Sequence, residues 1–185
     1  MNQSEAERLC RKRFERNLTH MAERMMDVQQ LSNLIPGNWF SSAASEVHKM
    51  YIAGHFYGAL SVAQAYVERL GKFIAMRRGI PVHKDPKAMW PRLVEHGIIT
   101  QSSCYSALAT WAGRHDFHHL NEPVEQDPDL LRDRARATVL ALHAIEDEVY
   151  GYTFADGAIV LKHPEYWDPI PDNPGTVRVE MRSLL

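Results

Sequence analysis

A dense group of side chains that can transfer protons or bind anions lies in the stretch WAGRHDFHHLNE, residues 111–122. Its members are Arg114, His115, Asp116, His118, His119 and Asn121. Histidine changes charge near neutral pH, and the arginine guanidinium is a permanent cation that binds anionic oxygens. The group therefore predicts a site of acid–base chemistry. A structural role is the alternative, in which the same side chains cap helices and hydrogen-bond across a loop.

Helices must position this group, because helical patterns dominate the chain as far as about residue 154. We expect helices over residues 4–34, 42–53, 56–78 and 86–95, one that follows Thr100 and includes Trp111, and a last long helix after Asp127. Thr100 and Asp127 suit the N-cap position, and Pro128 suits the first turn. The chemical group thus falls between the last two helices, where Gly113 lets the backbone bend.

Beyond Phe154 the sequence changes character. Residues 158–161 are apolar, a proline-rich stretch follows, and Val177, Val179 and Met181 alternate with charged residues, which is typical of a half-buried strand. We expect a small two-stranded hairpin here. The predicted fold class is all-α, an antiparallel helical bundle. Its expected divisions are an N-terminal helical extension (1–36), a helical domain (37–154) and a C-terminal β arm (155–185).

Composition excludes several classes of protein. The chain has 185 residues, a formal net charge of −2 and two cysteines, Cys10 and Cys104, which rules out a disulfide scaffold and a thiolate zinc cluster. Phosphate-binding, dinucleotide-binding and zinc-protease motifs do not occur. The charged first residues and the absence of a long apolar run predict a cytoplasmic protein with no signal peptide and no membrane contact.

The spacing of Arg114 and His119, with the polar His115 directly after the arginine, resembles the R-x4-6-H motif of the HEPN superfamily. The stretch YIAGHFYGALSVAQAYVERLGKF is similar to the early helices of that family, and the resemblance covers about residues 42–152. The same spacing recurs at Arg13/His20, Arg77/His83, Arg78/His83 and Arg136/His143. Only Arg114 is followed by the Asn, Asp or His that the family prefers.

The resemblance implies a HEPN-like bundle that acts as a metal-independent endoribonuclease, needs no cofactor and forms a homodimer whose second subunit completes the site. His119 would be the acid or base, and Arg114 would bind the scissile phosphate. On an unbroken helix, however, Arg114 shares a face with His118 rather than His119, so His118 remains a candidate. The remaining expected site residues are His115 in catalysis and Asp116, Asn121 and Glu68 in substrate binding.

RNA is the expected substrate, and the family implies a toxin or a phage-defence effector with an antitoxin or a nucleotidyltransferase as a further partner. Two other interpretations stay open. Many HEPN domains are non-catalytic modules for binding or dimerisation. The adjacent pair His115-Asp116 also resembles the HD-type metal phosphohydrolases, with His96 upstream and Asp147 downstream, and His115 and His119 could hold one metal from one helical face.

Several other polar residues have a structural interpretation. Glu68 and Lys72 are four apart on a helix and predict a surface ion pair. The run Glu146-Asp147-Glu148 predicts an exposed acidic turn more readily than a metal site. His55 and His143 lie in apolar stretches and are expected to be hydrogen-bonded core or interface residues. The aromatic pair Tyr166-Trp167 is expected to anchor the arm.

Overall fold

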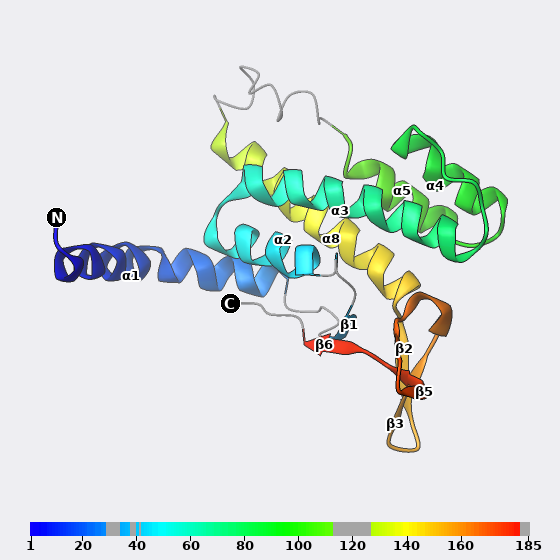
Figure 1. Ribbon diagram of the computed structural model, residues 1–185. Helices are drawn as coiled ribbons and strands as arrows, with labels where there is room; N and C mark the ends of the chain where they lie inside the picture. The colour runs from blue at the N-terminus through cyan, green and yellow to red at the C-terminus, as the bar shows by residue number, and fades with distance from the viewer. Residues whose placement is uncertain (29–33, 38–39, 41, 113–126, 182–185) are drawn as a thin grey trace.

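The computed structural model describes residues 1–28, 34–37, 40, 42–112 and 127–181, and it is mainly helical (Figure 1). Its described helices are α1 (Gln3–Asp27), α2 (Ser42–Ala53), α3 (Phe56–Arg77), α4 (Pro86–Glu95), α5 (Gln101–Ala109) and α8 (Pro128–Val149). Its described strands are β1 (Leu34–Pro36), β2 (Tyr152–Ala155), β3 (Ala158–Leu161), β4 (Pro169–Ile170), β5 (Asn173–Val177) and β6 (Val179–Met181). The expectation of a helical protein with a small β arm is confirmed at this level.

The bundle is built around α3 and α8, which pack against each other. Helix α2 packs on both of them, α5 packs on α8, and α4 joins α3 to α5. The two long helices each carry one buried apolar stripe. On α3 the stripe consists of Leu60, Ala63, Val67, Leu70 and Ile74; on α8 it consists of Leu131, Val139, Leu142, Ile145 and Val149. None of the described helices has the length and apolar character needed to cross a lipid bilayer.

Most helix ends lie where capping chemistry places them. Thr100 accepts a hydrogen bond from the backbone of Ser103, and Asp127 accepts from the first turn of α8, as expected. Gly97 follows α4 with a positive φ of 65°, which suits a glycine beyond a helix end. Two ends differ: α1 stops at Asp27 rather than near residue 34, and α5 stops before Trp111.

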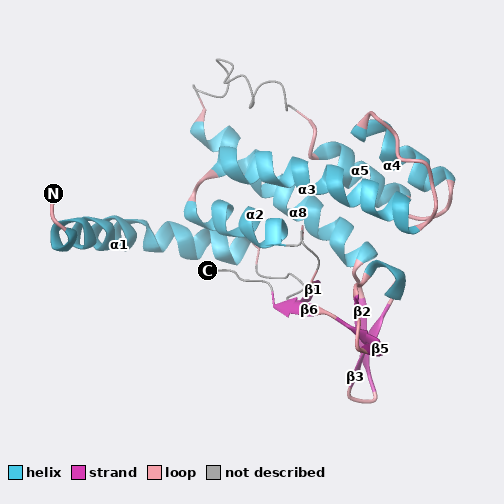
Figure 2. Ribbon diagram, in the orientation of Figure 1, coloured by secondary structure: helices cyan, strands magenta, loops and turns pink. Residues whose placement is uncertain are grey.

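Strands gather at one end of the bundle, where Figure 2 shows them in magenta. The expectation of one hairpin differs from the structure, which has three two-stranded antiparallel sheets among the described residues: β2–β3, β4–β5 and β1–β6. In the last of these, Leu34 is opposite Met181 and Pro36 is opposite Val179. A strand that follows α1 therefore supplies the partner of β6, so the segment after the first helix and the last described strand meet in one sheet.

Aromatic side chains and ion pairs fasten the arm to the bundle. Tyr166 and Trp167, each 2% exposed, belong to the hydrophobic core, which confirms their expected anchoring role. Burial raises the pKa of Tyr166. At the end of α3, Arg77 pairs with Asp168, while Arg78 is 2.8 Å from Glu165.

Candidate functional site

The sequence-predicted site lies in the connection between α5 and α8. Its six clustered members, Arg114, His115, Asp116, His118, His119 and Asn121, fall outside the described residues. The described chain stops at Ala112 and resumes at Asp127. The helices on either side of this connection can be described in detail.

A buried polar contact fixes the point where the chain leaves α5. The side-chain amide of Gln64 donates from Nε2 to the carbonyl oxygen of Thr110 at 2.9 Å. Gln64 on α3 is 4% exposed and Thr110 is 1% exposed. A buried amide without a partner is costly, so this hydrogen bond holds the end of α5 at one position along α3.

The start of α8 is fixed from the other side. Asp127 accepts hydrogen bonds from the backbone nitrogens of Asp129 and Leu130, both at 3.0 Å. One and two turns further on, Arg132 and Arg136 lie 3.7 and 3.4 Å from the carboxylate of Asp27, the last residue of α1. The first half of α8 is therefore held against α1 by charge.

The carboxylate of Asp27 also binds α2. The hydroxyl of Tyr51 donates to Asp27 Oδ2 at 2.7 Å, and Tyr51 is 0% exposed. Burial, followed by the hydrogen bond and the negative charge of Asp27, raises the pKa of Tyr51 to about 12. Tyr51 and Asp27 thus form a contact in which the phenol stays protonated.

A second buried contact joins α2 to α8 through two histidines. His48 Nδ1 donates to the carbonyl oxygen of Ala44 at 2.7 Å, and His48 Nε2 contacts His143 Nε2. Since a carbonyl oxygen only accepts, Nδ1 of His48 carries a proton, and in the neutral ring Nε2 is the acceptor of the hydrogen bond from His143 Nε2. The two rings meet edge to face with centroids 4.4 Å apart. The expectation of a hydrogen-bonded core histidine is confirmed for His143.

A third contact joins α3 to α8. Tyr66 donates its hydroxyl proton to Glu146 Oε1 at 2.9 Å, and both residues are nearly inaccessible, at 2% and 4% exposure. Glu146 lies three residues after His143, so both project from one face of α8. In the described structure a substrate cannot reach these buried groups. Their hydrogen bonds instead hold the helices in position relative to one another.

The three carboxylates of the acidic run at the end of α8 have different surroundings. Glu146 points into the core, whereas Asp147 is exposed. The Glu148 carboxylate accepts two hydrogen bonds from Thr100, one from the backbone nitrogen and one from the hydroxyl of that residue, both at 2.6 Å. The expectation of an exposed acidic turn is therefore wrong for Glu146. Within the described part of the chain, no group of three metal-binding side chains occurs.

Two other predicted residues can be placed. Glu68 pairs with Lys72 on α3, which confirms the surface ion pair. Its expected role in substrate binding stays a prediction. His55 precedes α3 and is exposed, so its assignment to the core is wrong, and its assignment to an interface stays a prediction.

The other arginine–histidine matches to the R-x4-6-H spacing have contacts elsewhere. His20 is exposed and pairs with Glu23 at 3.2 Å. His83 contacts the backbone of Asp85. Arg77 and Arg78 pair with acidic residues of the arm, Arg136 pairs with Asp27, and His143 pairs with His48. In each of these four described matches, at least one member contacts a residue outside the pair.

The residues that the HD-type interpretation requires are described only in part. His96 is the exposed residue that ends α4, and it lines a shallow pocket with Arg77 and Arg78. Asp147 is exposed on the last turn of α8, beside Lys162 in a different pocket. His115 and Asp116 lie outside the described residues, so this arrangement stays a prediction.

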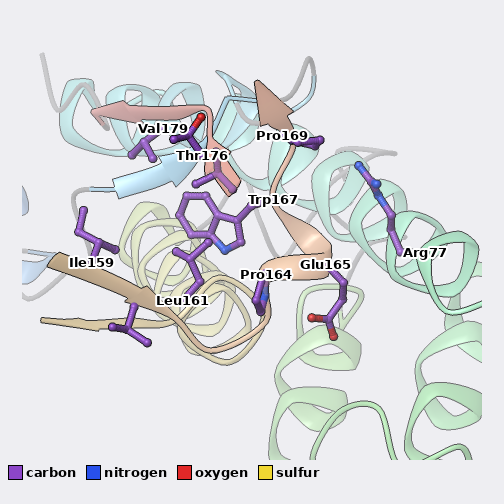
Figure 3. Close-up of a pocket in the computed structure, with 11 residues that line it drawn as sticks. Arg77, Ile159, Leu161, Pro164, Glu165, Trp167, Pro169, Thr176 and Val179 are labelled. Atoms are coloured by element: carbon purple, nitrogen blue, oxygen red, sulfur yellow. The ribbon is translucent and has the colours of Figure 1, made fainter. Parts of the chain in front are cut away.

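An apolar pocket of about 800 Å³ lies in the arm (Figure 3). Its lining includes Leu161 of β3, Val179 of β6, and Trp167 from the segment before β4. Arg77 and Glu165 lie at one side of it. Sequence reasoning missed this pocket because β3, the segment around Trp167, β5 and β6 come together only in the packed arm. It also missed His48, Tyr66 and Gln64, although His143 and Glu146 on the apolar face of α8 indicated that buried partners must exist.

No family model matches the chain, and neither a curated protein nor a solved structure matches it.

Proposed function

We propose that the protein is a metal-independent endoribonuclease of HEPN type, in which Arg114 binds the scissile phosphate and His119 transfers protons. The observation that carries the proposal is the spacing of Arg114 and His119, with polar His115 after the arginine, in the connection that leads into the last long helix. The described helical body is consistent with such a domain.

The residue types suit the reaction. When the 2′-hydroxyl of RNA attacks the adjacent phosphorus, a bond forms from the 2′-oxygen and the bond to the 5′-oxygen breaks. A base removes the 2′-hydroxyl proton, an acid protonates the departing 5′-oxygen, and a cation stabilises the charge on the five-coordinate phosphorus. Histidine can be either the base or the acid, and a guanidinium can grip two phosphate oxygens at once. A second subunit would supply the second histidine.

The contacts of the body favour this match over the others with the same spacing. In each of the four described alternatives at least one member is engaged in a contact with another residue, which makes these pairs weaker candidates. The helix ends that bracket the connection are each held by polar contacts. Gln64 holds the end of α5 through Thr110. At the start of α8, Asp127 caps the first turn and Arg136 pairs with Asp27. A fixed support of this kind is what a catalytic loop needs.

The neighbouring residues have secondary roles in the proposal. His118 is the alternative acid or base, and His115 assists it. Asp116, Asn121 and, from α3, Glu68 contact the substrate. The cellular role that follows is that of a cytoplasmic toxin or phage-defence effector controlled by an antitoxin or a nucleotidyltransferase.

RNA cleavage by the full chain in excess EDTA tests the proposal. His119→Ala should lower the rate about 10²–10⁴-fold, the range for loss of a general acid or base. His20→Ala is a matched control, because Arg13 and His20 have the family spacing but His20 is exposed on α1 and pairs with Glu23. This control should cleave at the parent rate.

The other outcomes separate the alternatives. A larger loss in His118→Ala than in His119→Ala would assign the acid or base to His118. Cleavage that appears only when Mn²⁺ or Mg²⁺ is restored would contradict the proposal and favour the HD-type metal site. Equal rates in His119→Ala and His20→Ala would also contradict it.

A non-catalytic binding module is the second candidate. The observation that favours it is the apolar pocket in the arm, whose volume and lining suit a small apolar ligand or a partner segment. No cleavage with or without metal would make this module the better account.

A further inference from the structure

One apolar stripe runs along α1 from Cys10 to the end of the helix, but the bundle covers only half of it. The stripe keeps a spacing of three or four residues and consists of Cys10, Phe14, Leu18, Met21, Met25 and Val28, the residue that ends the helix. Such spacing places all six on one face. Figure 1 shows the first half of α1 extending away from the bundle, while the second half lies beside α2.

Burial along this stripe changes abruptly. Val28 is 2% exposed, and Met21 and Met25 pack against the core. Phe14 and Leu18 are 53% and 51% exposed, although they continue the same face. An aromatic and an aliphatic side chain in line with a buried interface indicate a surface that is covered in an assembly.

We propose that the exposed half of α1 pairs antiparallel with the same half of α1 in a second copy of this chain. The buried half of the stripe sets the direction. A parallel partner laid on Phe14 and Leu18 would run into α2, which occupies the same face from Met21 onward. In an antiparallel pair, the bundle of the second copy instead lies beyond the free N-terminal end of the first copy's α1. The first turn of the second copy's α1 then lies near the C-terminal end of the first copy's α2.

Charge favours a second copy as the occupant. Arg8, Arg11 and Glu15 lie along one flank of the stripe, because they are three, four and seven positions apart. In an antiparallel pair related by a two-fold axis near residue 12, this flank of one helix faces the same flank of the other helix. Glu15 then lies between Arg8 and Arg11 of the other helix, and the contact repeats on the opposite side of the axis. Cys10 lies opposite Phe14 in the same register.

The charges suit a membrane surface less well. Glu7 lies directly in line with Cys10 and Phe14, three and seven positions before them, and hydrogen-bonds Gln3 at 3.0 Å. An anionic bilayer laid along this stripe would meet the Glu7 carboxylate, whereas a basic apolar helix needs that face free of acids. The pairing does not rest on the proposed ribonuclease activity, because α1 lies outside residues 42–152 and Phe14→Glu tests the surface of α1 alone.

Sedimentation velocity of the full chain across a micromolar concentration series tests the pairing. We expect a reversible dimer that Phe14→Glu weakens at least about 100-fold in Kd, which corresponds to about 2.8 kcal/mol. Leu9→Glu is the matched control: Leu9 is 45% exposed on the same helix but lies about 140° from Phe14 around it. Its Kd should equal that of the parent.

A charge exchange identifies the partner as a second copy. Glu15→Arg alone and Arg8→Glu with Arg11→Glu should each weaken self-association, because like charges then face each other. Mixing the two variants should restore dimers, since every contact in the mixed pair joins opposite charges. Circular dichroism should show the parent helix content in each variant.

The native cysteines give an independent readout. Cys10 is exposed on the stripe, whereas Cys104 is buried and burial raises the pKa of its thiol. A thiol reagent should therefore label Cys10 alone, and labelling should slow as the chain concentration rises. A parent that stays monomeric, including one that instead binds anionic vesicles, would overturn the proposal. So would a Phe14→Glu dimer as tight as the parent, or mixed charge variants that associate no better than each alone.

Discussion

Tyr51 should make the stability of the protein depend on pH in the alkaline range. The phenol is 0% exposed and donates to Asp27 at 2.7 Å, and burial together with this carboxylate raises its pKa from 10.0 to about 12. An unfolded chain ionises Tyr51 near pH 10, whereas the folded chain keeps it neutral until near pH 12. The stability that this group contributes is therefore complete below pH 10 and is lost as the pH rises from 10 to 12.

The expected size of the loss follows from the pKa difference. Two pKa units at 1.36 kcal/mol each correspond to about 2.7 kcal/mol. Tyr51→Phe removes the titration together with the hydrogen bond, which contributes about 1.5–3 kcal/mol when the acceptor is charged. The parent should therefore be the more stable protein at pH 8, and its advantage should disappear by about pH 12.

Urea unfolding of the parent and Tyr51→Phe at intervals from pH 8 to pH 12 measures this difference. Tyr105→Phe is the matched control, because Tyr105 is 65% exposed and its removal should leave the pH profile of the parent unchanged. Absorbance of the tyrosinate at high pH gives a second readout, in which one tyrosine fewer should ionise late in Tyr51→Phe than in the parent, since burial also raises the pKa of Tyr166. Parallel loss of stability in the parent and Tyr51→Phe across this range would refute the reasoning.

Two further substitutions test contacts of α8 by urea unfolding at pH 7. Tyr66→Phe removes the buried donor to Glu146 and should destabilise the protein by about 1.5–3 kcal/mol; a change below about 0.5 kcal/mol would show that this hydrogen bond is not formed. Glu148→Ala removes the acceptor at Thr100, where α5 begins, and should destabilise the protein by about 1 kcal/mol. The adjacent Asp147→Ala serves as its control and should change stability by less than about 0.5 kcal/mol, so equal effects would contradict the capping role.

The helices could be predicted from the sequence because their signals are local. Asp127 followed by Pro128 marks the start of α8, and Thr100 marks the start of α5 within one residue. Glycine marks the end of α4, and α2 has the expected bounds at both ends. These side chains act on backbone groups a few residues away, so neighbouring residues suffice to identify them.

The strand pairings could not be predicted in the same way. β1 has three residues, and its partner β6 lies more than 140 positions further along the chain. Nothing local to Leu34–Pro36 distinguishes such a segment from a loop, and the helical composition before it extended the expected α1 too far. The alternation of Val179 with its charged neighbours indicated a strand but not which strand would pair with it.

In the candidate site, too, local patterns could be predicted from the sequence and long-range contacts could not. Arg114 and His119 could be predicted as a pair from their spacing, because they lie five positions apart in the sequence, and both lie outside the described residues. The buried partners of α8 were not found, because Tyr66 and Glu146 are 80 positions apart and each is unremarkable alone. A tyrosine on a helix predicts a core residue, and only the packed structure shows which carboxylate its hydroxyl reaches.

These polar contacts give the bundle an orientation that its apolar core alone would not define. Burial of apolar surface is non-directional, so stripes such as those on α3 and α8 allow small rotations and shifts along the helix axes. Gln64 and Tyr66 are two positions apart, which places them on different faces of α3. One holds the end of α5 through Thr110, and the other holds α8 through Glu146. Helix α3 is thereby fixed in rotation relative to both helices that bracket the Arg114–His119 connection. A change at either contact should therefore alter the support of that connection even where the apolar core stays packed.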